Sequence, residues 1–483
     1  MKRSFCLLPA LALLFPALAF TAAPAQADLA SDVRAILAGP GMAHVKHSIK
    51  LVRLADGGRA VALLDANATA PMTPASNLKL ITTSAALEQL GPGFKFRTLL
   101  LQHDGDLILV GDGDPSFGDA ELLKKSGWDA ATVFQTWAAG LAARKIGPVR
   151  RVLVDDSVFD TQFLHPDWPA DQAQKHYMAE VAGMNLNVNC LDFYIKPSAG
   201  GSLVHYLTDP RTSFFSIKNT CVTGSENRIR LARVSDNNDL ELAGEANGPN
   251  DVPVSVTIHD PPMYAAAVLA ESLQAAGVSV GGIARDRTAR QHYLAQEAGW
   301  TLVAENQTPL TTVMARANKD SMNLYAECLS KRLGFAVSGQ GSWFAGTAAV
   351  GQFLTRIGVP ASEYNIVDGC GLSRTDAISA NLMASVLEHD FYGPNAKTFM
   401  DTMAVVGVDG TMEDRFKGSD LRGRVFAKSG YINAVSCLSG YLHARDGGWY
   451  AFSILFNDVA VGDGKSAEEK IVHAMDVESV GGR

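Results

Sequence analysis

The front of the chain alternates between patterns typical of helices and of strands. Residues 31–37 repeat apolar side chains at helical spacing, whereas residues 47–54 and 59–64 read as two strands on either side of a Gly-containing turn. Apolar positions at helical spacing resume at Leu78 and stop before the run Gly91-Pro92-Gly93. The sequence therefore predicts a helix, a β-hairpin and a second helix before residue 94.

Residues 94–299 have mainly the short apolar period of β-strands. Hairpin strands are expected at 94–102 and 106–110, and short strands separated by Gly, Asn and Asp turns at 191–258. Further strands are expected at 149–154 and 278–283, and helices at 133–143 and 263–276. From residue 301 a strand leads into a helix beginning at Pro309. We therefore expect a mainly β insertion between a front piece and a helix-rich back piece.

The first 27 residues have the composition of a secretory signal peptide. Met1-Lys2-Arg3 provides a basic start, residues 4–20 are almost wholly apolar, and Ala25-Gln26-Ala27 provides a small-residue cleavage site. The apolar run is too short for a membrane-spanning helix, and no later stretch approaches one. We expect a mature chain from about Asp28 that lies outside the cytoplasm, with at most peripheral membrane association.

Composition excludes some classes of function. The net charge of −8 provides no basic footprint for nucleic acid. Five cysteines follow the predicted signal peptide, an odd number, so at least one lacks a partner within the chain. Cys190 and Cys221 are the one pair that we consider for a disulfide. The cysteine spacing fits no zinc-binding pattern, and the sequence indicates neither a metal nor a cofactor.

Ser76 is expected in the first turn of a helix whose apolar pattern begins at Leu78, and Lys79 follows about one turn later on the same face. A serine hydroxyl needs a neighbouring base to act as a nucleophile near pH 7. A lysine can be that base if burial or a nearby cation lowers its pKa from about 10.4. The helix N-terminus also offers N–H groups to a developing oxyanion. A capping serine beside a surface lysine is the alternative for this motif alone.

Ser-x-Asn occurs more than once. Ser235-Asp236-Asn237 matches the triplet of penicillin-recognising enzymes literally, but it lies between two strand-like runs and predicts a hairpin turn, as does Ser225-Glu226-Asn227. Ser321-Met322-Asn323 instead follows one predicted helix and opens another. Its two polar side chains lie at a junction among apolar neighbours, where they can face Ser76 and Lys79. We therefore take Ser321 and Asn323 as the second motif.

Lys-Ser-Gly also occurs twice. Lys125-Ser126-Gly127 closes a predicted helix, where glycine is a common stop. Lys428-Ser429-Gly430 lies between two strand-like runs. A cation at a strand edge beside glycine suits recognition of a carboxylate, because glycine lets a substrate backbone approach closely. A solvated lysine in a hairpin is the alternative for this copy.

The motifs stand in the order Ser76, Ser321 and Lys428, with gaps of 245 (321 − 76) and 107 (428 − 321) residues. With these gaps the chain resembles the class C, type-4 low-molecular-mass penicillin-binding proteins. These are D-alanyl-D-alanine carboxypeptidases and endopeptidases of the bacterial cell wall. Serine β-lactamases have a far shorter first gap. The resemblance extends to the runs 111–117, 155–160, 367–374 and 407–412.

The resemblance implies an α/β (α+β) fold. A domain like those of serine β-lactamases and transpeptidases, with an antiparallel sheet flanked by helices, would comprise residues 28–93 and 300–483. Two small, mainly β subdomains would be inserted as residues 94–299. The substrates would be peptidoglycan stem peptides ending in D-Ala-D-Ala, with β-lactams as covalent inhibitors. The location would be the periplasm, after removal of the signal peptide, residues 1–27.

The resemblance also implies roles that the chemistry suggests. Ser76 would attack the carbonyl between two D-alanines, and Lys79 would take its proton. Ser321 would relay a proton to the leaving group, and Asn323 would orient Lys79 and the substrate amide. Lys428 would neutralise the terminal carboxylate and help to lower the pKa of Lys79. Substrate contacts would also come from Ser429, Gly430 and Tyr431, with the N–H groups of Ser76 and Tyr431 as the oxyanion hole.

In that family an acidic residue after a tryptophan, together with an arginine, binds the free end of the stem-peptide diamino acid. The matching positions are Trp168, Asp171 and Arg374. A loop carboxylate without a ligand is the alternative for Asp171. The chain departs from the family pattern at Tyr431, where a small hydroxyl residue is usual, and at Cys370, where serine is usual.

Two other functions stay open. The first is a non-catalytic protein of the same fold that binds the cell wall or senses β-lactams, for which Tyr431 is the best support. The second is a serine β-lactamase or esterase on the related fold. The long first gap and the lack of a deacylating Glu signature argue against that second reading.

Overall fold

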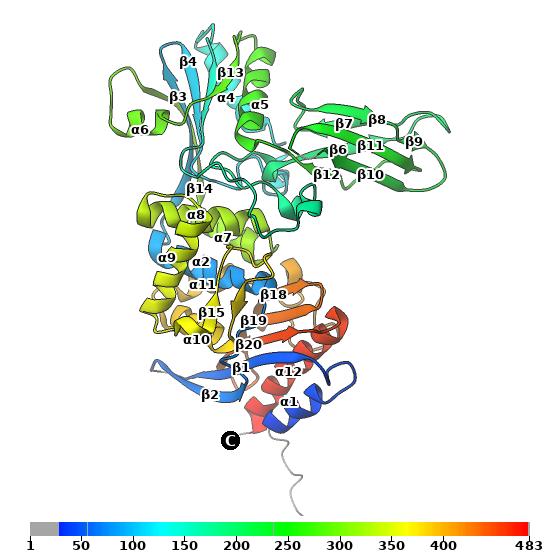
Figure 1. The fold of residues 1–483 in the computed structure, drawn as a ribbon, viewed down its shortest axis with the longest axis vertical. Coiled ribbons are helices and arrows are strands. Elements are labelled where there is room, and N and C mark those ends of the chain that lie inside the picture. Colours follow the sequence, from blue (N-terminus) through cyan, green and yellow to red (C-terminus); the bar gives the residue numbers. More distant parts are fainter. Residues whose placement is uncertain (1–28, 56, 235, 482–483) are drawn as a thin grey trace, which may run out of the picture.

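The computed structural model describes residues 29–55, 57–234 and 236–481. The predicted signal peptide, residues 1–27, lies outside the described residues. Figure 1 shows two bodies stacked along the long axis, with a lobe projecting sideways from the upper one.

A six-stranded antiparallel sheet organises the lower body, in the order β17-β18-β19-β20-β1-β2 (Figure 1). Its strands are β1 (Lys46–Ala55), β2 (Arg59–Ala66), β17 (Ala404–Val405), β18 (Val425–Ile432), β19 (Val435–His443) and β20 (Trp449–Asn457). The N-terminal strand β1 lies between β20 and β2, so the two ends of the chain share one sheet.

Side chains of β20 cover both faces of this sheet. Phe452 and Ile454 pack in one core with α1 (Leu29–Leu37) and α12 (Val461–Gly481). Ala451 and Leu455 pack in the other core, toward α10 (Ala380–Tyr392). Successive side chains of a strand point to opposite faces, so a nearly continuous apolar strand requires helices on both sides.

Helix α2 (Leu78–Leu90) is the centre of the helical layer, and all its residues from Leu78 to Leu87 are buried. It is surrounded by α7 (Leu310–Asn318), α8 (Asn323–Ser338), α9 (Trp343–Arg356) and α10. The short elements α11 (Ala396–Asp401), β15 (Tyr364–Asn365) and β16 (Ala377–Ile378) complete the layer. Because this helix is packed on all sides, its first turn has a fixed position.

The upper body contains a five-stranded sheet in the order β13-β5-β4-β3-β14. Its strands are β3 (Lys95–His103), β4 (Asp106–Val110), β5 (Val152–Asp155), β13 (Ile283–Arg285) and β14 (Thr301–Pro309). Helices α3 (Ala120–Leu123), α4 (Thr132–Ala143), α5 (Pro261–Ala275) and α6 (Ala289–Leu294) belong to the same region. Strand β14 pairs with β3 and leads directly into α7, so the chain returns to the lower body beside its point of departure.

The side lobe consists of two small sheets. One contains β6 (Cys190–Lys196), β7 (His205–Asp209) and β12 (Val254–Thr257). The other contains β8 (Ser216–Asn219), β9 (Val222–Thr223), β10 (Arg228–Arg233) and β11 (Asp239–Ala246). The series of short strands predicted for residues 191–258 is confirmed.

Two predictions about local structure are wrong. The strand predicted at 278–283 is instead β13, which begins at Ile283, because Gly281 and Gly282 interrupt the pattern. A Cβ at Gly281 would lie 2.6 Å from the Arg150 carbonyl oxygen. Cys190 and Cys221 do not form a disulfide, since both are buried free thiols.

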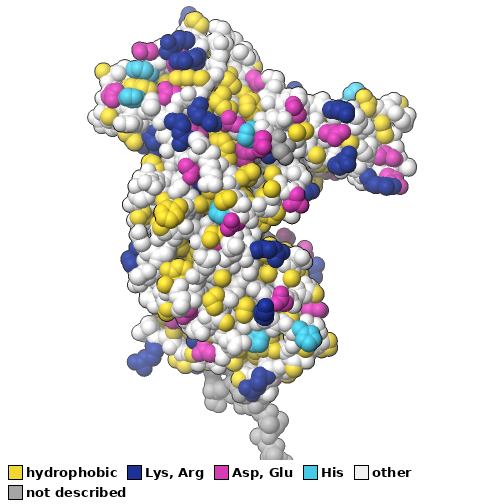
Figure 2. Space-filling model, viewed as in Figure 1, with side chains coloured by type: hydrophobic (Ala, Val, Ile, Leu, Met, Phe, Trp, Pro, Cys, Tyr) yellow, Lys and Arg dark blue, Asp and Glu magenta, His cyan; other side chains and the backbone are white. Residues whose placement is uncertain are grey.

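Among the helices that the structure describes, none has the length and apolar character needed to cross a bilayer. On the face seen in Figure 2, acidic and basic side chains are interspersed. This distribution agrees with the absence of a basic tract in the sequence.

Candidate active site

Ser76 lies in a short 3₁₀ turn, Ala75–Asn77, that runs directly into α2. The turn rests on β18, and a Cβ at Gly430 would lie 2.8 Å from Asn77 N and Pro74 O. Glycine at 430 is therefore required for a close approach within the protein, and the approach of a substrate backbone stays a prediction. This contact brings the nucleophile motif against the strand that carries Lys428.

The Lys79 amine is fully buried and has three acceptors. Its Nζ lies 2.7 Å from Ser76 Oγ, 2.7 Å from Asn323 Oδ1 and 2.9 Å from the Cys370 carbonyl oxygen. Burial lowers the pKa of Lys79, while Cys370, Asp368 and Glu327 act in the opposite direction. The amine therefore loses its proton more readily than an exposed lysine.

The direction of the Lys79 lone pair follows from these contacts. A charged amine donates three hydrogen bonds, whereas a neutral amine donates two and has one lone pair. The Cys370 carbonyl can only accept, and Asn323 presents Oδ1 because its Nδ2 donates to the Tyr177 carbonyl at 2.9 Å. When Lys79 is neutral, its lone pair is left facing Ser76 Oγ. This is the geometry of a serine with its general base.

Ser321 and Lys428 form the opposite side of the site. Lys428 Nζ donates to Ser321 Oγ at 2.9 Å and to the Ser429 carbonyl at 2.7 Å. Burial and the neighbouring Lys79 place the pKa of Lys428 well below its ordinary value. Ser321 has φ of 59°, a left-handed conformation that is uncommon for serine. Such strained residues gather at active sites, where the surrounding structure holds them in place.

A cavity of about 740 Å³ opens over these groups. It is lined by Ser76, Ser321, Asn323, Arg374 and Tyr431, and also by Asp167, Pro169, Gln172, Tyr177, Gly371, Leu372, Ile432 and Asn433. A volume of this size suits a small peptide or a drug-sized ligand. The structure thus brings five of the predicted site residues to one cavity, with Lys79 and Lys428 buried beneath it.

Trp168, Asp171 and Ser429 are not among the residues that line the cavity. Trp168 is buried, and its indole Nε1 donates to Asp368 Oδ2 at 3.0 Å. Asp171 is exposed and is not among the lining residues, whereas Asp167 is. Ser429 is buried, and its hydroxyl donates to Thr411 Oγ1 at 3.1 Å. Arg374 is exposed and donates to the Asn433 carbonyl at 3.1 Å.

The ring of Tyr431, the departure from the family pattern, is 43% exposed at the cavity wall. Lys465 Nζ lies 4.0 Å from its centroid, a cation–π contact that holds the ring in position. The phenol therefore stands as bulk at the rim of the cavity.

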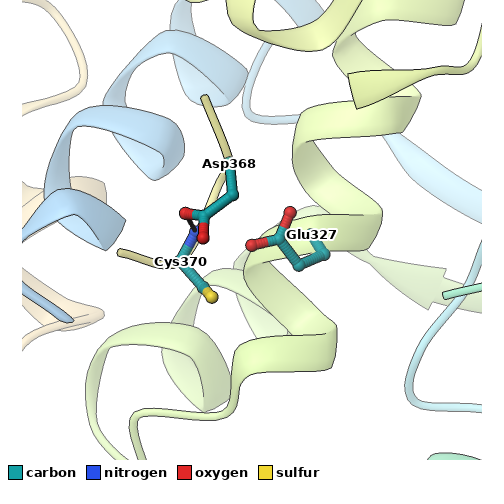
Figure 3. A group of neighbouring side chains, drawn as sticks. All are labelled: Glu327, Asp368 and Cys370. Atoms are coloured by element: carbon teal, nitrogen blue, oxygen red, sulfur yellow. Dashed lines mark hydrogen bonds between the residues drawn. The ribbon is translucent and has the colours of Figure 1, made fainter. Parts of the chain in front are cut away.

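Figure 3 shows Glu327, Asp368 and Cys370 close together, and the Cys370 carbonyl accepts from Lys79 Nζ at 2.9 Å. Burial raises the pKa of Glu327 to about 7 and that of the Cys370 thiol well above its ordinary value. Glu327 accepts from Gly369 N at 3.0 Å and from Trp343 Nε1 at 2.7 Å. Protein donors therefore already use the oxygens that a metal would need.

The other copies of the motifs are local structure. Asn237 lies in the turn between β10 and β11, and residue 235 is outside the described residues. Lys125 lies in a 3₁₀ turn closed by Gly127, which is left-handed with φ of 69°. Both are outside the cavity lining. The interpretation of these two copies as a hairpin turn and a helix stop is confirmed.

Sequence reasoning missed Tyr177 and the Cys370 carbonyl, which fix Asn323 and Lys79. Both contribute a backbone oxygen, which has no side-chain signature. The run around Cys370 was noted as part of the family resemblance, and that was the available signal. Nothing in the sequence around Tyr177 indicated its contact with α8.

The chain is similar to known proteins along most of its length. The profile of the D-Ala-D-Ala carboxypeptidase 3 (S13) family matches residues 29–478. A D-alanyl-D-alanine carboxypeptidase from Actinomadura sp. (strain R39) is 29% identical over 474 residues, covering 92% of this chain and 83% of the relative. The D-alanyl-D-alanine carboxypeptidase DacB from Haemophilus influenzae is 26% identical over 430 residues, covering 84% and 85%.

Solved structures share the fold. The crystal structure of penicillin binding protein 4 (dacB) from Haemophilus influenzae superposes with a TM-score of 0.74 at 22% identity, covering 92% of this chain and 98% of that one. The same protein complexed with a β-lactam superposes with a TM-score of 0.70 at 22% identity, covering the same shares. The predicted fold class is confirmed.

Proposed function

The chain belongs to the D-Ala-D-Ala carboxypeptidase 3 (S13) family, and on this premise we propose that Ser76 forms its acyl-enzyme with peptidoglycan stem peptides. The activity is that of a serine-type D-alanyl-D-alanine carboxypeptidase, which β-lactams inhibit covalently. One observation carries the assignment: Lys79 Nζ lies 2.7 Å from Ser76 Oγ, with its two other hydrogen-bond positions fixed by Asn323 and Cys370.

Acylation begins with neutral Lys79. Ser76 Oγ attacks the carbonyl carbon between the two terminal D-alanines, and its proton passes to Lys79 Nζ. The backbone N–H groups of Ser76 and Tyr431 stabilise the oxyanion. The carbon–nitrogen bond then breaks as the proton that Lys79 took from Ser76 passes through Ser321 Oγ to the leaving amine, which leaves Lys79 neutral again. Lys428, which donates to Ser321 at 2.9 Å, supports this relay and binds the terminal carboxylate.

Deacylation reverses the roles. Water attacks the ester carbonyl and transfers a proton to Lys79 as the base. The bond to Ser76 Oγ breaks, and that oxygen takes a proton from Lys79. The product is a stem peptide shortened by one D-alanine, and the enzyme returns to its starting protonation state. With a cross-linked peptide as substrate, the same steps constitute endopeptidase activity.

The finer substrate contacts are part of the proposal. Asp171 and Arg374 bind the free end of the stem-peptide diamino acid, with Trp168 as their neighbour in the family pattern. Support is stronger for Arg374, which lines the cavity, than for Asp171. We place the protein in the periplasm, because its substrate is the cell wall and its first 27 residues have the composition of a signal peptide.

Mass spectrometry of penicillin-treated protein tests the nucleophile. The adduct is expected on the peptide containing Ser76, and Ser76→Ala should abolish it, whereas Ser235→Ala, from the other Ser-x-Asn copy, should not. An adduct on a different serine would overturn the assignment. A D-Ala-D-Ala peptide then separates the functions. Release of D-Ala indicates the carboxypeptidase, labelling without release a sensor, and rapid penicillin turnover a β-lactamase.

A further inference from the structure

The loop of residues 367–373 is gathered around one carboxylate. Both oxygens of buried Asp368 accept hydrogen bonds. Oδ1 accepts from Cys370 N at 3.0 Å and Gly371 N at 2.6 Å, and Oδ2 accepts from Leu372 N at 3.1 Å and Ser373 N at 2.8 Å. A fifth donor is Trp168 Nε1 at 3.0 Å. Because several N–H groups donate to one carboxylate, this turn is held in a single conformation.

This turn is pressed against the catalytic helix. Gly371 has φ of +80°, and a Cβ there would lie 1.9 Å from the Ala75 carbonyl oxygen. The Gly369 carbonyl accepts from Thr82 Oγ1 at 2.7 Å, and the Cys370 carbonyl accepts from Lys79 Nζ at 2.9 Å. The Asp368 carboxylate thus fixes the positions of the Gly369 and Cys370 carbonyls against α2, and the Cys370 carbonyl contacts Lys79.

We propose that Asp368 is a positioning residue for Lys79, and that Trp168 acts through Asp368 rather than by contacting substrate. The proposal rests on the proposed function for its kinetic readout. Asp368 holds the Cys370 carbonyl in place, and that carbonyl occupies one of the two N–H groups of neutral Lys79. With Asn323 occupying the other, the lone pair is confined to Ser76.

Trp168 connects the loop of residues 367–373 to the inserted segment. It lies between β5 and β6, in the same connection as Tyr177, whose carbonyl holds Asn323 at 2.9 Å. The inserted segment therefore fixes two of the three acceptors of Lys79. It holds Asn323 through Tyr177, and it holds the Cys370 carbonyl through Trp168 and Asp368. The insertion is in this sense part of the catalytic apparatus.

Asp368 also affects the charge of the base. The titratable groups that face Lys79 within the described residues are Lys428 on β18, Glu327 on α8, and Asp368 and Cys370 in the loop. Asp376 and Glu327 adjoin Asp368 itself. Because Asp368 favours the charged form of Lys79, its neutralisation should lower the pKa of the amine.

Asp368→Asn tests the proposal. The plateau rate of acylation by a fluorescent penicillin should fall by about tenfold or more, the factor for one lost hydrogen bond to a charged group. The acid limb of the pH–rate profile should move to lower pH. Asp155→Asn is the matched control, since Asp155 is a buried carboxylate that accepts from Ser157 N at 2.8 Å and from Arg290 N in α6 at 2.6 Å. It should leave both quantities unchanged.

Trp168→Phe is the milder variant, and it should slow penicillin and stem-peptide acylation by the same factor. The proposal would be overturned if Asp368→Asn left the plateau rate unchanged, or lowered it without moving the acid limb. It would also be overturned if Trp168→Phe slowed acylation by stem peptides alone. NMR titration of the Lys79 side chain, with its signal assigned by comparison with Lys79→Arg, tests the positioning role of Asp368 separately from the proposed function. If wild-type protein reacts with neither ligand, the proposed function fails. An unshifted Lys79 titration in Asp368→Asn overturns the positioning role in either case.

Discussion

Replacing Asn323 by alanine tests how the lone pair of Lys79 is aimed. The substitution removes Oδ1, which lies 2.7 Å from Lys79 Nζ, and Nδ2, which donates to the Tyr177 carbonyl at 2.9 Å. The neutral amine then keeps the Cys370 carbonyl as its remaining fixed acceptor. It can rotate its lone pair away from Ser76 Oγ, so the fraction of productive orientations falls.

The expected magnitude follows from that lost contact. Leaving a buried donor without its partner costs about 1–3 kcal/mol. At about 1.36 kcal/mol for each factor of ten in rate, acylation should slow by roughly 5- to 150-fold. Since Asn323 is only half-buried at the start of α8, the fold should persist, and the melting temperature of the variant checks this.

Stopped-flow measurement with a fluorescent penicillin gives the second-order acylation rate constant. Asn237→Ala is the matched control, because Asn237 belongs to the other Ser-x-Asn copy and accepts from Asp239 N in a hairpin turn. It should stay within about threefold of wild type, the factor for under 1 kcal/mol. An Asn323→Ala variant that folds and also acylates within threefold would refute the lone-pair account.

Asn323→Asp supplies an independent check. A carboxylate beside Lys79 favours the charged amine and raises its pKa. Acylation lost near neutral pH should then recover as the pH rises through the new value. A rate that stays low at every pH would point instead to loss of a contact with the substrate amide.

Three further predictions concern the rest of the cavity. Lys428→Ala removes the side chain expected to bind the substrate carboxylate, so acylation should fall about tenfold or more, whereas Lys125→Ala should stay within about threefold. Tyr431→Thr should speed acylation by bulky β-lactams and change small ones little, and equal slowing of all would show that the phenol takes part in the reaction. Asp171→Ala should weaken turnover of peptides with a free diamino acid end and spare penicillin; a loss that appears with Asp167→Ala instead would assign the subsite to that cavity-lining carboxylate.

The sequence indicated which side chains meet at the cavity better than which backbone groups hold them. Residue type and local context together selected, among repeated short motifs, the copies with Ser76, Lys79, Ser321, Asn323 and Lys428, which the structure brings together. For Gly430 the sequence predicts room for a substrate backbone, and the structure adds a close contact within the protein. Its close neighbour is the Pro74–Asn77 turn, a contact between segments far apart in the chain.

The features that the sequence did not predict share a physical cause, because they depend on contacts between segments far apart in the chain. The Trp168 indole donates to a carboxylate 200 residues away, which no local pattern records. The Cys370 carbonyl and the Tyr177 carbonyl act without their side chains. The strand expected at 278–283 failed because glycines fit a close approach to Arg150 that becomes visible only in the folded sheet.

Strand β1 has its partners at opposite ends of the chain. It pairs with β2 next to it, and with β20 across a separation of 405 residues (454 − 49 for Ile49 and Ile454). During synthesis or export from the N-terminus, one edge of β1 therefore has no paired strand until β20 has emerged. The helix of Ser76 is made early, but Lys428 and the sheet that carries it are made late. A partly delivered chain thus holds no assembled hydrolase, and a truncation before Trp449 leaves the β1 edge uncovered.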